Sequence, residues 1–423
     1  MSRQYKDSGI EWIGQIPSDW TIVPTKRNFQ YKKNIVGTKS DVYDRLALTM
    51  GGVIKRNKDD NEGLQPEKFD GYQILKPNEL VFKLIDLANA KTSRVGLSKY
   101  TGIVSPAYII LRNKQKDNRF YYYWFMFMYY NLIFNHMGDD GVRSALSPED
   151  VLNIPIPLIS LNDQLPIADF LDKKCAEIDG LIELQEQMIA QLTDYKQSVI
   201  TEAVTKGLNP NVEFVPSGVD WIGEIPKGWK VMRMKFLGTF QNGLTYTPYD
   251  VCGAEGILVL RSSNIQDSKL TFDDNVFVTK APEELMVKKG DIIICSRNGS
   301  ASLVGKCALV EENIKKCSFG AFMVRFRSVI FQKYAYYLVS TVIPQYKQLF
   351  TTTTINQLTK GMLSSMMGVL PPKVEQQTIA TYLDKKCGEI DDLIRMKQKK
   401  IETLKEYKKS MIYEAVTGKI NVA

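Results

Sequence analysis

Two stretches of the chain carry apolar residues at alternating spacings of four and three positions. The first covers residues 171–199, and the second repeats it 212 residues later over 383–411. This is the heptad pattern of a helix that packs against another helix, so we expect long helices over about 164–205 and 375–417. The stripe positions are Leu171, Cys175, Ile178, Ile182, Gln185, Ile189, Leu192, Lys196 and Val199, followed by Leu383, Cys387, Ile390, Ile394, Lys397, Ile401, Leu404, Lys408 and Met411.

The two predicted helices match in length and in phase, so each offers the other a seam of the same size. We favour pairing within one chain, with a homodimer seam and two unrelated bundle helices as alternatives. The chain leaves the first helix, builds a domain and then returns, which favours an antiparallel pair and a pseudo-two-fold internal repeat. A helix of about 42 residues is about 63 Å long, which exceeds one turn of B-DNA at about 34 Å. Asn162 and Asp163 are candidates for the N-cap of the first helix.

A second element also occurs twice and lies outside the helices. The sequence SGIEWIGQIPSDW at 8–20 returns as SGVDWIGEIPKGW at 217–229, directly after the first helix. The order along the chain is therefore a Trp-containing element, an insert and a helix, and then the same three again. Because the first element opens the chain and its copy follows the first helix, we expect the C-terminus to lie near the N-terminus.

The inserts, about 21–160 and 230–372, differ in sequence but share one pattern of elements. Each has β-rich runs followed by an aromatic helix, over 119–134 and 331–350. We therefore assign the chain to the α+β class, with two mixed α/β domains separated by two long antiparallel coiled-coil helices. The predicted strands cover 45–50, 79–85 and 106–112 in the first insert, and 257–262, 291–297 and 321–327 in the second.

The aromatic helix of the first insert carries a stripe of large rings. The stripe is formed by Phe120, Tyr123, Trp124, Phe127 and Phe134. An aromatic surface can stack nucleic-acid bases, but helical spacing of this kind is typical of a face buried in a core. We expect these side chains to pack in the core of the first domain.

Composition is typical of a globular protein with more than one domain. The chain has 423 residues, of which 44% are hydrophobic and 24% are charged. No apolar run approaches the length of a membrane-spanning helix, and the start of the chain has no signal-peptide pattern, so we expect a cytoplasmic protein. The formal net charge of +8 permits contact with a polyanion but does not by itself establish it.

The sequence lacks the common motifs of catalysis and of nucleotide binding. It contains neither a GxxxxGK[ST] loop nor a GxGxxG run after a strand, and its six cysteines form no CxxC pair. The single histidine, His136, lies in aromatic surroundings without the partners of a catalytic triad. We expect a binding protein with no catalytic residue and no metal site of its own.

Polar and basic loops follow the predicted strands and are the candidates for contact with DNA. They carry Arg, Lys, Asn and Ser beside glycine, which suits phosphate oxygens and base edges, although ordinary solvated turns have a similar composition. The candidate DNA-binding residues are Lys91, Ser93, Arg94, Lys99, Arg143 and Ser144 in the first domain, and Arg261, Asn264, Arg297, Asn298, Lys306, Asn356 and Lys360 in the second.

In combination, the duplicated elements resemble the specificity subunits of type I restriction-modification systems. The resemblance rests on the two Trp-containing elements, on IPIPLISLNDQLPIADFLDKKCAEID (154–179) and VLPPKVEQQTIATYLDKKCGEID (369–391), and on EAVT at both helix ends. It covers the whole frame of the chain, whereas the inserts match in general shape only. The run LNDQLPIAD departs from the acidic-Gln pattern that VEQQTIAT keeps, which leaves the start of the first helix less well defined.

The resemblance implies a division of the chain into four parts. Residues 1–160 and 209–372 would be target-recognition domains, each reading one half of a split double-stranded DNA sequence. Residues 161–208 and 373–423 would be conserved spacer helices that set the distance between the halves.

The resemblance also implies partners. The subunit would have no catalytic activity and would recruit two methyltransferase subunits and the restriction subunits, with the methyltransferases docked on the paired helices and adjoining domain surfaces. S-adenosylmethionine, ATP and Mg²⁺ would bind to those partners, so we expect no cofactor in this chain and no membrane contact. The alternatives are a coiled-coil scaffold without DNA readout and an enzyme that itself cleaves or methylates DNA, for which no segment is left over.

Overall fold

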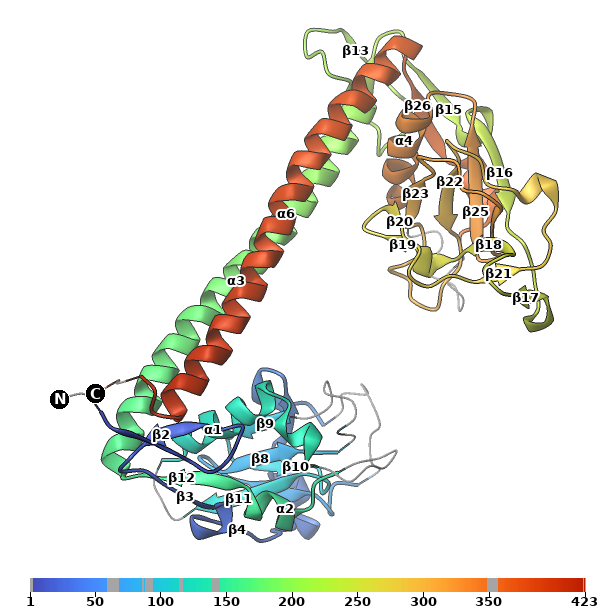
Figure 1. The fold of residues 1–423 in the computed structure, drawn as a ribbon. Helices are drawn as coiled ribbons and strands as arrows, with labels where there is room; N and C mark the ends of the chain where they lie inside the picture. The colour runs from blue at the N-terminus through green and yellow to red at the C-terminus, as the bar shows by residue number, and fades with distance from the viewer. Residues whose placement is uncertain are drawn as a thin grey trace. The chain divides into compact units, whose positions relative to one another are not determined.

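The chain forms two compact units. The computed structural model describes residues 3–58, 68–85, 87, 94–113, 117–137, 145–347, 357–420 and 422. The first unit comprises Met1–Glu186 and Gln398–Ala423, and the second comprises Gln187–Lys397. Each unit contains one mixed α/β domain and one segment of each of the two long helices (Figure 1).

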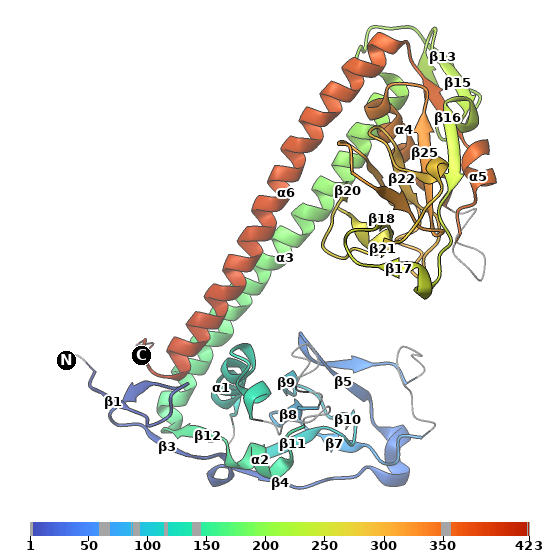
Figure 2. The same cartoon turned by 45° about the vertical axis from the view of Figure 1, so that its right-hand side comes forward.

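The long helices are α3 (Leu161–Lys206) and α6 (Lys373–Val416). The first unit joins the start of α3 to the end of α6, and the second joins the end of α3 to the start of α6. The helix segments lie side by side in each unit (Figures 1 and 2), so the predicted antiparallel pairing within one chain is confirmed. All the stripe positions are buried or half-buried, whereas most other positions between residues 172 and 199 are exposed.

The start of α3 differs from the prediction. Ser160, not Asn162 or Asp163, occupies the capping position, and its Oγ accepts a hydrogen bond from the Asp163 amide at 3.2 Å. The Ser160 hydroxyl in turn donates to the Asp163 carboxylate at 2.6 Å. Asp163 is thus the third residue of the helix, where a carboxylate also interacts favourably with the helix dipole.

Both domains contain a four-stranded antiparallel sheet of the same strand order. The central strands correspond to predicted ones, and the order is β4-β11-β8-β9 in the first domain and β16-β25-β22-β23 in the second. The strands of the first sheet are β4 (Phe29–Tyr31), β11 (Ile109–Asn113), β8 (Leu80–Lys83) and β9 (Arg94–Leu97). Those of the second are β16 (Gly238–Asn242), β25 (Met323–Ser328), β22 (Ile292–Cys295) and β23 (Cys307–Leu309).

A second four-stranded sheet in each domain includes one parallel pair of strands. The orders are β6-β5-β10-β7 and β17-β21-β18-β24, and the parallel pairs are β5 with β10 and β18 with β24. The first sheet consists of β6 (Gly52–Arg56), β5 (Arg45–Thr49), β10 (Gly102–Val104) and β7 (Gln73–Leu75). The second consists of β17 (Val251–Cys252), β21 (Phe277–Val278), β18 (Ile257–Leu260) and β24 (Cys317–Phe319).

The repeated Trp-containing elements form small hairpins that lie against the ends of the long helices. They are β1 (Tyr5–Asp7) with β2 (Gln15–Pro17), and β13 (Phe214–Pro216) with β14 (Glu224–Pro226). After α6, Gly418 has φ +71° and approaches Pro17 and Trp20 so closely that a Cβ would lie 2.5 Å from the proline ring. The Tyr5 hydroxyl donates to the Gly418 carbonyl at 3.1 Å, which places the two chain ends together as expected.

A two-stranded sheet ties each domain to its own helix. In the first domain β3 (Thr21–Pro24) pairs with β12 (Pro155–Leu158), which leads into α3. In the second, β15 (Lys230–Arg233) pairs with β26 (Met367–Leu370), which leads into α6.

The aromatic helices α1 (Arg119–Tyr130) and α4 (Gln332–Gln345) occupy equivalent places in the two domains. The aromatic stripe of the first is buried, and all five of its rings belong to the main core of that unit, as predicted. Among the described residues, no helix combines the length and the apolar character needed to cross a membrane.

Candidate nucleic-acid interface

The parallel pair in the second domain brings two loops to one edge of the sheet. Parallel neighbours end at the same edge, and the Gly320 amide after β24 donates to the Leu260 carbonyl at the end of β18, at 2.9 Å. Residues 261–264 and 320–322 therefore leave the sheet side by side.

Two further segments join them. The end of β22 lies beside the start of β25, so residues 296–298 lie next to residues 320–322. Asn298 Nδ2 donates to the Ser262 hydroxyl at 3.1 Å, and Arg297 forms a β-bridge with Gln357. We call the surface formed by residues 261–264, 296–298, 320–322 and 357–360 the loop edge.

Arg297 links two segments of the loop edge, through its bridge with Gln357 and its contact with Phe322. Its guanidinium carbon lies 5.3 Å from the centre of the Phe322 ring, a cation–π arrangement, and Phe322 is 58% exposed. The amides of Ser296 and Arg297 both donate to the Phe322 carbonyl, at 2.9 and 3.2 Å, which fixes the two segments together. Among the described residues its guanidinium takes part in the contact with Phe322 and in no ion pair, and the planar donors of such a group suit a base edge or a phosphate.

Arg261 and Asn264 form a local turn. Asn264 is fully buried, and its Oδ1 accepts from the Arg261 amide at 2.9 Å while its Nδ2 donates to the carbonyls of Thr271 and Asp274 at 3.0 and 3.3 Å. Arg261 is half-buried and forms an ion pair with Asp274 at 2.7 Å. Asn264 therefore shapes the turn from below, and Arg261 lies at its surface.

Of the remaining described candidates of the second domain, Asn298 is half-buried, whereas Lys306 and Lys360 are exposed. Asn298 accepts from the Ser300 amide at 3.0 Å and so also orders its own turn. Lys306 lies at the end of the same loop, where its carbonyl accepts from the Cys295 amide at 2.8 Å. Lys360 begins α5 (Lys360–Ser365), one residue after its N-cap Thr359.

In the first domain the described candidates do not come together. Arg94 begins β9 and lies opposite Lys83 at the end of β8, whereas Lys99 lies in the turn after the other end of β9. A strand of this length separates its ends by about 13 Å at about 3.3 Å per residue. The other candidates of this domain, Lys91, Ser93, Arg143 and Ser144, lie outside the described residues, as does Asn356 in the second domain.

One backbone arrangement is common to both domains. The Leu146 amide donates to the Leu84 carbonyl at 3.1 Å, as the Leu358 amide does to the Ser296 carbonyl at 2.7 Å. A β-bridge follows in each case, Ile85 with Ala145 and Arg297 with Gln357. The two domains therefore share the backbone arrangement at this place, whereas the side chains on it differ.

Sequence reasoning missed the aromatic residues of this surface. Phe322 has only its position two residues after Gly320 to mark it, and a single aromatic residue at a strand start is common. Tyr249, in the segment between β16 and β17, is 97% exposed, and the start of that segment meets the loop edge, where a Cβ on Gly243 would lie 2.1 Å from the Gly320 oxygen. Its exposure is visible only in the folded chain.

Cys295, Cys307 and Cys317 are buried in the core of the second domain. Burial raises the pKa of Cys307 and of Cys317 to about 12, and it also raises the pKa of Cys295. These thiols stay protonated at neutral pH and act as small apolar core residues. His136 is exposed, and no group of three or more possible metal ligands occurs among the residues that the structure describes.

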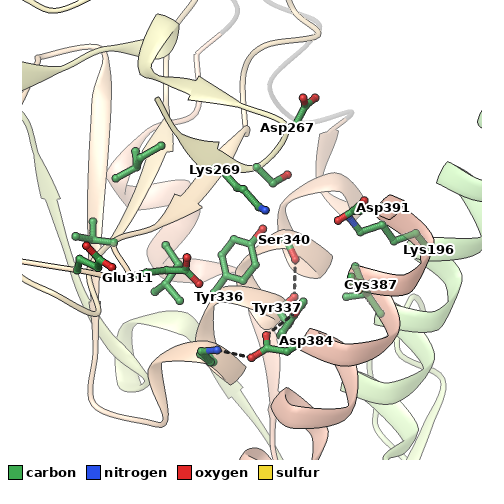
Figure 3. A pocket seen from close by; sticks show the side chains of 18 of the residues that line it. Lys196, Asp267, Lys269, Glu311, Tyr336, Tyr337, Ser340, Asp384, Cys387 and Asp391 are labelled. Atoms are coloured by element: carbon green, nitrogen blue, oxygen red, sulfur yellow. Dashed lines mark hydrogen bonds and ion pairs between the residues drawn. The ribbon is translucent and has the colours of Figure 1, made fainter. Parts of the chain in front are cut away.

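A cavity of about 1160 Å³ opens elsewhere in the second unit, between the helix pair and its domain. Figure 3 shows Lys196 and Asp391 on the side of the helices, with Tyr336, Tyr337 and Lys269 on the side of the domain. Acidic and basic side chains are mixed in its wall, so it lacks the uniform positive charge expected of a surface for DNA.

Comparison with known proteins places this architecture in one family. The family model described as the type I restriction modification DNA specificity domain matches the chain twice, at residues 24–194 and 226–406. The two matches end at equivalent positions of the internal repeat, 212 residues apart.

Two curated relatives come from Methanocaldococcus jannaschii. The chain is 28% identical over 280 residues to the type I restriction enzyme MjaVIII specificity subunit, a match that covers 64% of this chain and 63% of that protein. It is 25% identical over 447 residues to a provisionally named type I restriction enzyme MjaX specificity subunit, with coverage of 97% and 96%. The chain thus spans just under two thirds of the first relative and nearly all of the second.

A solved structure shares the fold over the whole chain. It comes from work titled as the structural basis underlying complex assembly and conformational transition of the type I R-M system. The TM-score is 0.69 at 16% identity, with 96% of this chain and 99% of that chain covered.

Proposed function

Because the chain belongs to the type I restriction-modification DNA specificity family, we propose that its two mixed α/β domains each read one half of a split DNA target. The chain is a sequence-recognition subunit, in line with the specificity subunits that it resembles over most of its length. The alternatives of a scaffold without DNA readout and of an enzyme in its own right have no support among these relatives.

The proposal rests on one observation: the two domains share the same backbone arrangement at their β-bridges but carry different side chains there. At equivalent bridges the first domain has Ile85 and Ala145, where the second has Arg297 and Gln357. Side chains of different hydrogen-bonding capacity recognise different base edges. The two halves of the target should therefore differ, and the target should be non-palindromic.

We assign DNA contact in the second domain to the exposed part of the loop edge. Arg297 would read a base edge, and its cation–π contact with Phe322 supports this assignment by restricting the direction of the guanidinium. The other residues proposed for this interface are Arg261, Asn298 and Lys360 on the loop edge, and Lys306 at the far end of the loop that follows β22. In the first domain Arg94 and Lys99 stay predictions, together with the candidates outside the described residues.

The partners follow from the same assignment. We propose that methyltransferase subunits dock beside the helix pair and that restriction subunits join them, so that methylation and cleavage take place on the partners. S-adenosylmethionine, ATP and Mg²⁺ would then be bound outside this chain. The helix pair would fix the number of unspecified base pairs between the two halves.

The experiment is methylation by the reconstituted complex of this chain with its methyltransferase partner. Long-read sequencing of DNA methylated by that complex should give one split motif with two different halves and a fixed spacer. A DNA-binding titration against that motif and against a scrambled duplex, at matched salt, should show a preference for the motif. A continuous motif, a palindrome, or equal binding to both duplexes would overturn the proposal.

A further inference from the structure

The joint between each domain and the helix pair is built twice from equivalent residues. We call the first set the first junction and the second set the second junction. The first junction consists of Arg119, Tyr123, Asp172, Asp179 and Lys408, and the second consists of Lys333, Tyr337, Asp384, Asp391 and Lys196. All members of each set lie within one unit of the structure.

Each junction holds an aspartate by a tyrosine and a cation from the aromatic helix. In the first, the Tyr123 hydroxyl donates to Asp172 Oδ1 at 2.7 Å, and Arg119 Nη1 donates to Asp172 Oδ2 at 2.7 Å. In the second, the Tyr337 hydroxyl donates to Asp384 Oδ1 at 2.9 Å, and Lys333 forms an ion pair with the same carboxylate. These contacts seat each domain on one particular turn of its helix.

One heptad further along the helix, a second aspartate receives a lysine from the opposite helix. Lys408 of α6 donates to both oxygens of Asp179 at 2.7 Å, and Lys196 of α3 donates to those of Asp391 at 2.7 and 2.8 Å. Figure 3 shows this arrangement in the second unit, where Lys196 reaches Asp391 and Asp384 lies beside Tyr337. Each junction thus joins a domain and both long helices.

The two lysines occupy seam positions, where apolar side chains would pack better. The Lys408 side chain is only 17% exposed. A polar residue at a seam position specifies the register of a coiled coil at a cost in stability. The surroundings of Lys408 are largely shielded from solvent. Burial there raises the pKa of the Cys175 thiol to about 11 and the pKa of the Tyr122 hydroxyl to about 12.

The contacts of each junction oppose a shift of α6 along α3 by one heptad. Such a shift would bring Lys408 opposite Asp172 and Lys196 opposite Asp384, so opposite charges would still meet. Both of these aspartates are already bound by the tyrosine and cation of their own domain. The slipped register would therefore have to share each carboxylate between two cations or unseat the domain.

We propose that the two junctions are positioning sites that lock the register of the helix pair to the seating of each domain. They thereby determine the spacer length that the subunit accepts. This inference rests on the proposed function. A slip of one heptad would shift the helices by about 10 Å along their axes, which corresponds to about three base pairs at about 3.4 Å each.

The decisive variant is Lys196→Met combined with Lys408→Met, which keeps the length of both side chains and removes their charge. Removing one partner of an ion pair is strongly destabilising when the other charge stays buried, but both aspartates left behind are partly exposed, and an apolar side chain at a seam position packs better than a lysine. The thermal midpoint should stay the same or rise. The matched control is Lys409→Ala, because Lys409 is the next residue on α6 and its ion pair with Glu406 is confined to its own helix.

The readout is methylation of duplexes whose spacer differs from the native length by up to three base pairs in each direction. The double Lys→Met variant should lose preference for the native spacer by about tenfold, the change that about 1.4 kcal/mol of discrimination produces. The control should keep the preference of the unmodified chain. The charge exchange Asp179→Lys with Lys408→Asp should restore it at the first junction.

The outcomes separate this inference from the proposed function. If the unmodified complex shows no split motif at all, the proposed function fails. If it shows one and the folded double variant keeps its strict spacer, the inference is wrong. An equal loss of methylation at every spacer length, or a variant that unfolds, would reduce the lysines to a structural role and would overturn the inference as well.

Discussion

Arg297 and Lys306 lie on the same loop of the second domain but should contribute to DNA binding in different ways. Arg297 is half-buried and oriented by Phe322, so the direction of its planar donor group is restricted. Lys306 is exposed and has no comparable orienting contact among the described residues. A planar, oriented guanidinium suits a base edge, whereas a flexible ammonium suits a phosphate.

Arg297→Ala should relax recognition at one base position by about 1–3 kcal/mol. Lys306→Ala should weaken binding to all sequences alike and reduce the salt dependence by about one phosphate contact. Binding titrations at several salt concentrations, on the motif and on its single-base variants, distinguish the two. An exposed control is Lys174→Ala on α3, whose ion pair with Glu177 lies within its own helix. If Arg297→Ala and Lys306→Ala gave the same profile, the division of roles would be wrong.

Asn264 illustrates a limit of composition-based site prediction. Asparagine, arginine and serine in a loop suggest polar contacts with a ligand, but the same side chains also satisfy the backbone of tight turns. Asn264 uses both its amide and its carbonyl oxygen inside the turn. The sequence does not show whether an asparagine contacts a ligand or bonds to the backbone of its own turn, because that depends on whether its side chain is buried in the folded chain.

At the scale of elements, the long helices were predictable and the small sheets were not. The apolar stripe of each long helix repeats over many turns, so each of its positions supports the prediction of a helix. Strands such as β1, β12 and β26 have three or four residues, too few to show an alternation. Two of them, β12 and β26, form only because they pair with strands far away in the sequence, β3 and β15. Ser160 was missed as a cap because Asn162 and Asp163, which follow Leu161, are equally good capping residues by their side chains.

The length of the helix pair offers a direct test of the spacer hypothesis. Deleting one heptad from each helix, residues 183–189 and 398–404, keeps the phase of the seam and leaves both lysine–aspartate pairs intact. Each helix becomes shorter by about 10 Å. The methylated motif should keep both of its halves, while the unspecified spacer becomes shorter by about three base pairs.

Methylome sequencing of the deletion variant measures the spacer directly. Deleting only one of the two heptads is the control, because it breaks the match between the helices and should abolish methylation. An unchanged spacer in the double deletion would contradict a role of the helices in setting the distance.

For the whole molecule, the decisive property is that two domains with different interfaces belong to one chain. Once one domain is bound to its half-site, the second binds at a high effective concentration, provided that its own half-site is within reach. The net charge of +8 adds a sequence-independent attraction that falls as salt rises. Discrimination between DNA sequences should therefore come from both domains together, and general affinity from charge.

This reasoning predicts how the assembled complex binds altered duplexes. A duplex with only one half-site should bind about 10² to 10⁴ times more weakly than the full target, because the contribution of linkage is lost. A duplex with both halves but with five added spacer base pairs should bind like the half-site duplex. The added base pairs move the second half-site away and also turn it to the opposite face of the DNA. Adding a full turn of about ten base pairs returns the second half-site to the same face of the DNA as in the native target, but the two half-sites are then too far apart. Titrations of the four duplexes at one salt concentration test this order, and near-equal affinity for the full and single half-site duplexes would show that one domain alone carries recognition.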